Sequence, residues 1–114
     1  MHGAVPGGAY ILEFFEAGCE HCQESAPKLC GQRVPVFAVD AAKESASTVN
    51  SFRSQYARCA YPMLLDPSLT AAAAYSVNSV PTVYLVDNGR IAYAGAGVDG
   101  VNGLDSAVTK AVGG

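Results

Sequence analysis

Two cysteines, Cys19 and Cys22, stand three positions apart in the stretch FFEAGCEHCQESAPKL, which covers residues 14–29. Three kinds of site could use such a pair: a structural disulfide, half of a metal site, or a redox-active dithiol. A structural zinc site usually has a second Cys-x-x-Cys or histidine pair, whereas Cys30 and Cys59 stand alone. A bare Cys-x-x-Cys is weak evidence, so the elements around the pair must decide its chemistry.

The pair lies where a buried strand gives way to a helix. The run AYILEFF, Ala9 to Phe15, predicts the strand, and residues 20–30 are helical in character. Cys19 would then lie at the N-terminal end of the helix, where unpaired N–H groups and the helix dipole favour its thiolate form. Cys22 would lie one turn further in, within reach of Cys19 but shielded. This asymmetry suits thiol–disulfide exchange, in which Cys19 attacks and Cys22 resolves the mixed disulfide.

The composition indicates one globular domain, because half of the 114 residues are hydrophobic and only 15% are charged. The net charge of −3 gives no electrostatic case for binding nucleic acid or an anionic membrane. No apolar run approaches the roughly 20 residues that span a bilayer. We expect residues 1–9 to form a flexible leader or a segment of artificial origin, and residues 10–114 to form one domain. Membrane contact would then require an anchor that has been removed.

Apolar runs and turn residues predict the remaining elements. Strands are expected at 34–40 and 61–66 and on both sides of Asp87-Asn88-Gly89, a strong hairpin signal. Helices are expected at 45–58, capped by Ser45 or Ser47, at 67–77, opening with Pro67, and at 103–112. Gly31 is expected to end the first helix with a positive φ. The order β-α-β-α-β-α-β-β-α predicts an α/β fold, with a mixed central sheet and helices on both faces.

With these elements in place, the chain resembles the thioredoxin-like superfamily, and more closely its TlpA/ResA-like branch of thiol–disulfide oxidoreductases. The stretch YILEFFEAGCEHCQESAPKL resembles the family's strand, active-site Cys-x-x-Cys and kinked helix, with Pro27 as the kinking proline. SVPTVYLVDNGRIAYAGAG resembles its Pro-Thr segment and closing hairpin, and YPMLLDPSLTAAAAYSV resembles the strand and helix that the TlpA-like branch inserts. The resemblance runs from about Tyr10 to the C-terminus and implies a thioredoxin fold.

The resemblance implies roles for particular residues. Cys19 would be the nucleophile and Cys22 the resolving thiol. Pro81 would follow a cis peptide bond, placing the Val80 backbone beside the sulfurs, where it pairs with an extended substrate segment. Glu13 would be the family's buried acid, with a pKa raised by burial, and would exchange a proton with Cys22. The alternative for Glu13 is an inward-facing acid held by a neighbouring lysine.

One departure from the family pattern precedes the first cysteine. Gly18 stands where the family usually has tryptophan, and the chain contains no tryptophan. The glycine would open the pocket and remove an apolar platform for substrates.

The residues between the cysteines bear on the direction of electron flow. Protonated His21 would stabilise the Cys19 thiolate, as in the oxidising DsbA-like proteins, whereas Glu20 opposes this, with Glu16 and Glu24 adding negative charge. An exposed His21 with little effect is the other interpretation. We favour a reductant, on the TlpA-like insertion, with a DsbA-like oxidant as the alternative.

Two questions about the sulfurs stay open at this point. Cys30 and Cys59 end two helices that are expected to run away from the Cys19–Cys22 pair. They could lie close together there and form a disulfide, or they could be two buried, inert thiols. The second functional class is a metallochaperone, in which Cys19, Cys22 and a nitrogen of His2 or His21 hold Cu(I). A proline beside the thiols would crowd out the metal, so we predict no metal and no cofactor.

The expected partners are protein thiol or disulfide substrates and a redox partner protein, with the chain acting as a monomer. TlpA-like members commonly work outside the cytoplasm. We therefore expect an extracytoplasmic location, periplasmic or membrane-tethered, with the cytoplasm as the alternative.

Overall fold

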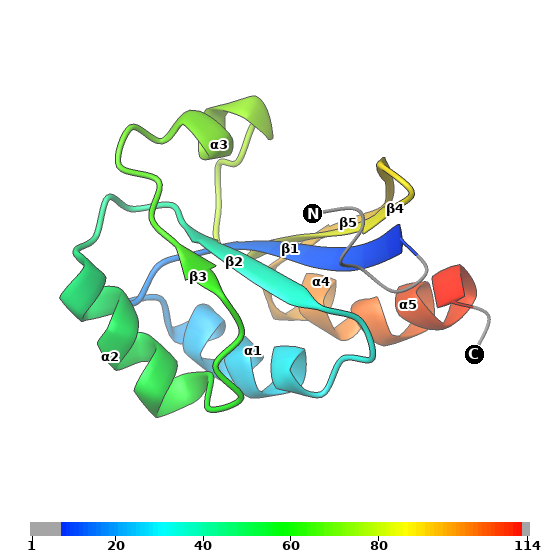
Figure 1. The fold of residues 1–114 in the computed structure, drawn as a ribbon, viewed down its shortest axis with the longest axis horizontal. Helices are drawn as coiled ribbons and strands as arrows, with labels where there is room; N and C mark the ends of the chain where they lie inside the picture. The colour runs from blue at the N-terminus through cyan, green and yellow to red at the C-terminus, as the bar shows by residue number, and fades with distance from the viewer. Residues whose placement is uncertain (1–7, 113–114) are drawn as a thin grey trace.

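The computed structural model describes residues 8–112, so most of the expected leader, residues 1–7, and the final two glycines lie outside the described part. Within it, one sheet has the strand order β3-β2-β1-β4-β5 (Figure 1). The bounds are β1 Ala9–Phe15, β2 Val36–Asp40, β3 Met63–Leu64, β4 Thr82–Asp87 and β5 Arg90–Ala96. β1, β2 and β3 pair in parallel, whereas β4 is antiparallel to both β1 and β5. The sheet is therefore mixed, as the sequence predicted.

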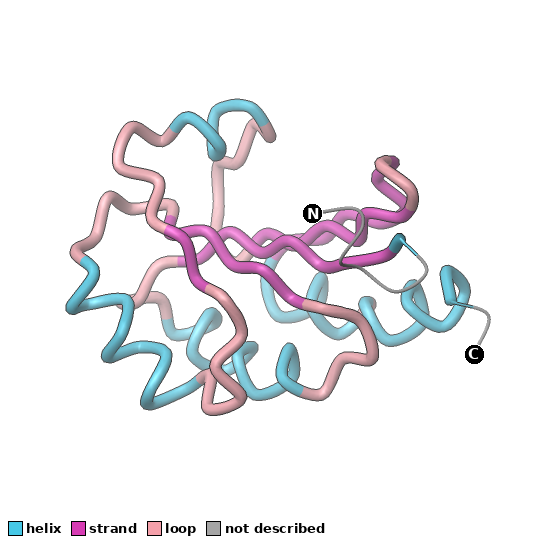
Figure 2. Tube along the Cα trace, viewed as in Figure 1, coloured by secondary structure: helices cyan, strands magenta, loops and turns pink. Residues whose placement is uncertain are grey.

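Helices cover both faces of this sheet, unequally (Figures 1 and 2). They are α1 Glu20–Cys30, α2 Ala46–Tyr56, α3 Thr70–Ala74, α4 Gly97–Asn102 and α5 Leu104–Val112. Alternation along β1 sends Ile11 and Phe15 into the main core, which is completed by buried residues of α1, α2, α4 and α5. Phe14 points to the opposite face and packs with Val39 of β2 and Ala72 of α3. By the same alternation, Glu13 faces α1.

Helix α1 begins and ends close to where its sequence indicated. Cys19 is its N-cap, and Cys22, Ala26 and Leu29 lie buried on its inner side, with Pro27 inside the helix. Gly31 ends it with φ −87°, so the expected positive φ was wrong. The last turn tightens instead: the Gly31 N–H donates to the Lys28 carbonyl, an i to i+3 bond that needs no left-handed residue.

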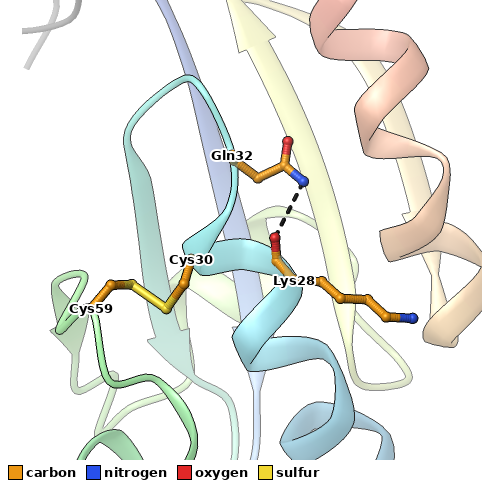
Figure 3. The surroundings of a disulfide bond; sticks show 4 residues. All are labelled: Lys28, Cys30, Gln32 and Cys59. Atoms are coloured by element: carbon orange, nitrogen blue, oxygen red, sulfur yellow. Dashed lines mark hydrogen bonds between the residues drawn. A yellow bond between two sulfur atoms is a disulfide. The ribbon is translucent and has the colours of Figure 1, made fainter.

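A disulfide joins the end of α1 to the segment after α2. Cys30 and Cys59 are bridged with their Cα atoms 5.7 Å apart (Figure 3). Both helices pack on the same face of the sheet, with Phe15 and Phe52 ring centroids 5.0 Å apart beneath them. The question of a bridge or two buried thiols is thereby answered in favour of the bridge, and Cys59 is exposed. Beside the bridge, the Gln32 side chain donates to the Lys28 carbonyl (Figure 3).

Caps and turns set the other boundaries. Ser45 caps α2 by accepting from the Thr48 N–H at 3.1 Å, so Ser45 and not Ser47 is the cap. The helix expected from Pro67 begins only at Thr70, because the Asp66 carboxylate accepts from the N–H groups of Ala71 and Ala72.

The last part of the described chain combines an expected hairpin with an unexpected helix. Asn88 and Gly89 take φ values of 53° and 80° in the turn between β4 and β5. Helix α4, which the sequence did not predict, packs directly on β5: a Cβ on Gly100 would lie 2.5 Å from the Gly95 carbonyl carbon. Only glycine allows this approach. Within residues 8–112, no helix has the length and apolar character needed to cross a bilayer.

Candidate active site

The cysteine pair occupies the first turn of α1. Cys19 has extended backbone dihedrals, and its Sγ accepts a hydrogen bond from the Cys22 N–H at 3.2 Å. The Cys19 side chain is partly exposed, whereas Cys22 is fully buried, and both are free thiols in this structure. A sulfur anion at Cys19 would therefore have a backbone donor already aimed at it.

The segment Val80–Pro81 faces the same sulfur. Its peptide bond is cis, and the Cys19 thiol donates to the Val80 carbonyl at 3.7 Å. The Pro81 side chain is fully buried, and the Pro81 carbonyl accepts from the Gly97 N–H at 2.8 Å. The first residue of helix α4 thus holds the Val80–Pro81 loop from behind. The fold brings Val80 to the sulfur of Cys19, although the two residues are 61 positions apart in the sequence.

Glu13 lies completely buried on β1, on the face that α1 covers. Burial raises its pKa from 4.5 to about 8, because the charged carboxylate loses its hydration. The nearby Tyr61 hydroxyl opposes this rise in part, although it does not reach full hydrogen-bond geometry with either carboxylate oxygen. No lysine among residues 8–112 pairs with Glu13.

The buried thiol of Cys22 also resists ionisation. Burial is the main cause of its raised pKa, followed by its interaction with Cys19 and by the charge of Glu13. The Glu16 backbone acts in the opposite direction. Cys22 therefore keeps its proton until a nearby base removes it.

Tyr61 is a site residue that the sequence reasoning missed. The strand register aligns Glu13 with Ala38 and Ala38 with Met63. Tyr61 precedes Met63 by two positions and therefore lies on the same face as Glu13. Its pKa is raised, first by burial and then by the charges of Glu13 and Cys22. The tyrosine-proline pair before a short apolar run was visible in the sequence, but only the strand order shows that it borders Glu13.

Glu20 and His21, between the cysteines, are exposed. The His21 Nδ1 lies 3.6 Å from Glu24 Oε1, and these side chains are 65% and 61% exposed. Neither Glu20 nor His21 forms a hydrogen bond to Cys19 among the described residues. Gly18 is also exposed, and a Cβ added there would meet no atom within 4 Å.

The described residues contain no group of three or more histidine, cysteine or acidic side chains that could hold a metal ion. His2, considered as a copper ligand, lies outside residues 8–112.

Several solved protein structures have the same fold as this chain. A thioredoxin-like protein from Aeropyrum pernix superposes with TM-score 0.80 and 21% identity, over 95% of this chain and 80% of that one. StoA from Bacillus subtilis gives 0.70 and 20%, over 89% and 82%. A secreted Mycobacterium tuberculosis disulfide oxidoreductase homologous to E. coli DsbE gives 0.75 and 19%, over 90% and 81%. No protein-family model and no curated protein matches the chain. The predicted fold class is confirmed.

Proposed function

From the thioredoxin-like fold of this chain, we propose that it is a protein thiol–disulfide oxidoreductase, in which Cys19 and Cys22 exchange with the cysteines of other proteins. One observation carries the proposal. The Cys19 sulfur is partly exposed at the start of α1, between the Cys22 N–H and the Val80 carbonyl, while Cys22 lies buried one turn below.

The proposed reduction proceeds in two exchanges. The Cys19 thiolate attacks a substrate disulfide, forms a sulfur–sulfur bond to one substrate sulfur and releases the other, which takes up a proton. Cys22 then loses its proton and attacks the Cys19 sulfur, releasing the second substrate thiol. The substrate has gained two electrons and two protons, and the protein ends as the Cys19–Cys22 disulfide.

Glu13 is proposed to serve the second exchange. Its carboxylate form accepts the Cys22 proton, and in the reverse direction its protonated form returns one. A pKa of about 8 makes both forms available near neutral pH. The Val80 backbone is proposed to pair with an extended substrate segment, with Pro81 packed behind it.

We propose reductant as the direction. A strongly oxidising dithiol requires a stabilised reduced form, which here means a stabilised Cys19 thiolate. Among the described residues, only the Cys22 N–H donates a hydrogen bond to the Cys19 sulfur. His21, the residue that would favour an oxidant, lies instead beside Glu24.

The proposed location is extracytoplasmic. The Cys30–Cys59 disulfide fits an oxidising compartment, and one similar structure is of a secreted oxidoreductase. A reductant there needs a redox partner protein that renews its thiols. We propose that the chain meets this partner and its substrates as a monomer.

The test is insulin reduction by the reduced protein. Cys19→Ser should abolish it, and Cys22→Ser should accumulate a mixed disulfide through Cys19. A Cys30→Ser, Cys59→Ser double variant is the matched control and should stay active. A Cys19–Cys22 potential near about −270 mV would support the reductant, and one near about −120 mV the oxidant. Activity that survives Cys19→Ser would overturn the proposal.

A further inference from the structure

A groove opens between helix α2 and the loop that precedes Cys19, and its lining reaches Gly18, the residue before the reactive cysteine. Its volume is about 430 Å³, and Ala17 and Gly18 form part of its wall. Because Gly18 directly precedes Cys19, a substrate whose disulfide is attacked by Cys19 can place a neighbouring side chain in this groove. The absence of a side chain at Gly18 leaves this side of the groove open.

A single carboxylate gives the groove its charge. Of the described residues that line it, only Glu44 is acidic or basic. The Ala17 N–H donates to Glu44 Oε1 at 2.8 Å, which fixes the side chain, while Oε2 accepts no hydrogen bond among the described residues. We call this cavity the Glu44 groove.

The electrostatic surroundings of Glu44 favour a cation. Asp40 is fully buried behind it and accepts from the Glu44 N–H at 2.7 Å. The pKa of Glu44 is raised, mainly by burial and then by a side-chain hydrogen bond with Asp40, while the Ala17 N–H opposes the rise. The charges of Asp40 and Glu16 raise it further. No lysine or arginine of residues 8–112 forms an ion pair with Glu44. A positive group here would relieve the repulsion among three carboxylates, whereas an anion would add to it.

The rest of the groove suits a long side chain with a charged end. Phe52 and Tyr56, whose ring centroids are 5.3 Å apart, supply apolar wall, and Ser47, Thr48 and Gln55 supply polar rim. Lysine and arginine combine an aliphatic stem with a cationic head in this way.

We propose that the Glu44 groove is a substrate subsite that takes a lysine or arginine side chain close to the target cysteine. The inference rests on the proposed function, since it names the class of protein that the dithiol serves: proteins whose disulfide is flanked by a basic residue.

The test uses three disulfide-bonded peptides that differ at one position: lysine, glutamine or glutamate. That residue is moved one position at a time along either side of the cysteine. At the best position, kcat/KM should favour lysine over glutamine by about fivefold, the range of a partly exposed ion pair. The preference should shrink in high salt.

Two matched variants each remove one negative charge. Glu44→Gln keeps an oxygen for the Ala17 N–H and should bring the lysine-to-glutamine ratio close to one. Asp105→Asn, at an exposed site on α5, should leave the ratio as in the wild type. Equal rates for all peptides at every position, or a preference that survives Glu44→Gln, would overturn the subsite alone. Failure to reduce any peptide would instead overturn the proposed function.

Discussion

The two ends of α1 each hold a sulfur pair, and their surroundings are opposite. At the first turn, Cys19 and Cys22 lie three residues apart as free thiols, with Cys22 buried above an acid. At the last turn, Cys30 is bridged to Cys59, 29 residues away, and Cys59 is exposed. Helix α1 thus carries two free thiols at one end and, at the other, a disulfide that links it to the segment after α2.

The polar groups at the two ends differ in the same way. On the Cys22 side of the molecule, in β1, α1 and the segment before β3, four buried side-chain atoms have no hydrogen-bond partner: both Glu13 carboxylate oxygens, the Ser25 hydroxyl and the Tyr61 hydroxyl. A buried group left unpaired destabilises a protein by roughly 1–3 kcal/mol. Near the bridge, Lys28 donates to Asn102 at 2.7 Å and Gln32 to Asp105 at 3.0 Å, both in exposed positions. The comparison teaches that the end of α1 with the free Cys19–Cys22 pair gives up stability, whereas the bridged end adds it.

The largest expected effect is the pH dependence that Glu13 imposes on stability. The folded protein keeps this proton up to about pH 8, whereas the unfolded chain loses it near 4.5. The folded state therefore binds more protons in that window, and the free energy of unfolding falls as pH rises through it, by about 5 kcal/mol in total. Glu13→Gln should remove this fall, as measured by urea unfolding of the reduced protein at several pH values.

Glu24→Gln is the matched control, because this acid lies on the outer side of α1 and its side chain is exposed. It should leave the slope unchanged. If Glu13→Gln kept the wild-type slope, the buried acid beside Cys22 would not be the source of the lost stability.

The next effect concerns the bridged end. The Cys30→Ser, Cys59→Ser double variant should lower the free energy of unfolding by about 3 kcal/mol, because the bridge restricts a loop of intermediate length in the unfolded chain. Urea unfolding measures the loss, and insulin reduction by the same variant should persist. A variant that unfolds like the wild type would show that the bridge does not stabilise the fold. Loss of insulin reduction in a folded variant would show that the two ends are coupled.

The smallest effect concerns Tyr61. Its hydroxyl favours the charged form of Glu13, so Tyr61→Phe should raise the pKa of Glu13 further, by about half a unit. The carboxyl carbon signal of Glu13 in a pH titration by NMR would report it. Tyr84→Phe is the control, because it removes a hydroxyl that bonds to the Tyr75 carbonyl on the other face of the sheet. A Glu13 pKa that is unchanged or lower in Tyr61→Phe would contradict this link.

Much of the fold was predictable because local signals and packing agree. The strand Ala9–Phe15 and the helix Glu20–Cys30 begin and end where their apolar patterns indicated. Helix α4 was not predictable, because its sequence GVDGVN holds two glycines, poor helix formers. It forms where Gly95 and Gly100 let the helix backbone press on β5, a contact that appears only after folding.

The site was predictable to a different degree. The Cys-x-x-Cys at a strand–helix junction pointed to Cys19 and Cys22, and the positions taken from the resemblance place Glu13 below and Val80 in front of them. Their roles stay predictions. The Cys30–Cys59 bridge could not be derived, since it depends on α1 and α2 sharing one face of the sheet. Tyr61 required the register of three strands.

The two sulfur pairs are held apart by the length of helix α1. Cys22 and Cys30 are eight positions apart in the same helix, which at 1.5 Å per residue is about 12 Å. Because a disulfide needs its Cα atoms within about 7 Å, cysteines spaced that far apart along the helix cannot pair with each other inside a single folded molecule. Exchange between the Cys19–Cys22 pair and the Cys30–Cys59 bridge would need either a second protein molecule or an unwound helix, so the geometry itself guards against mispairing.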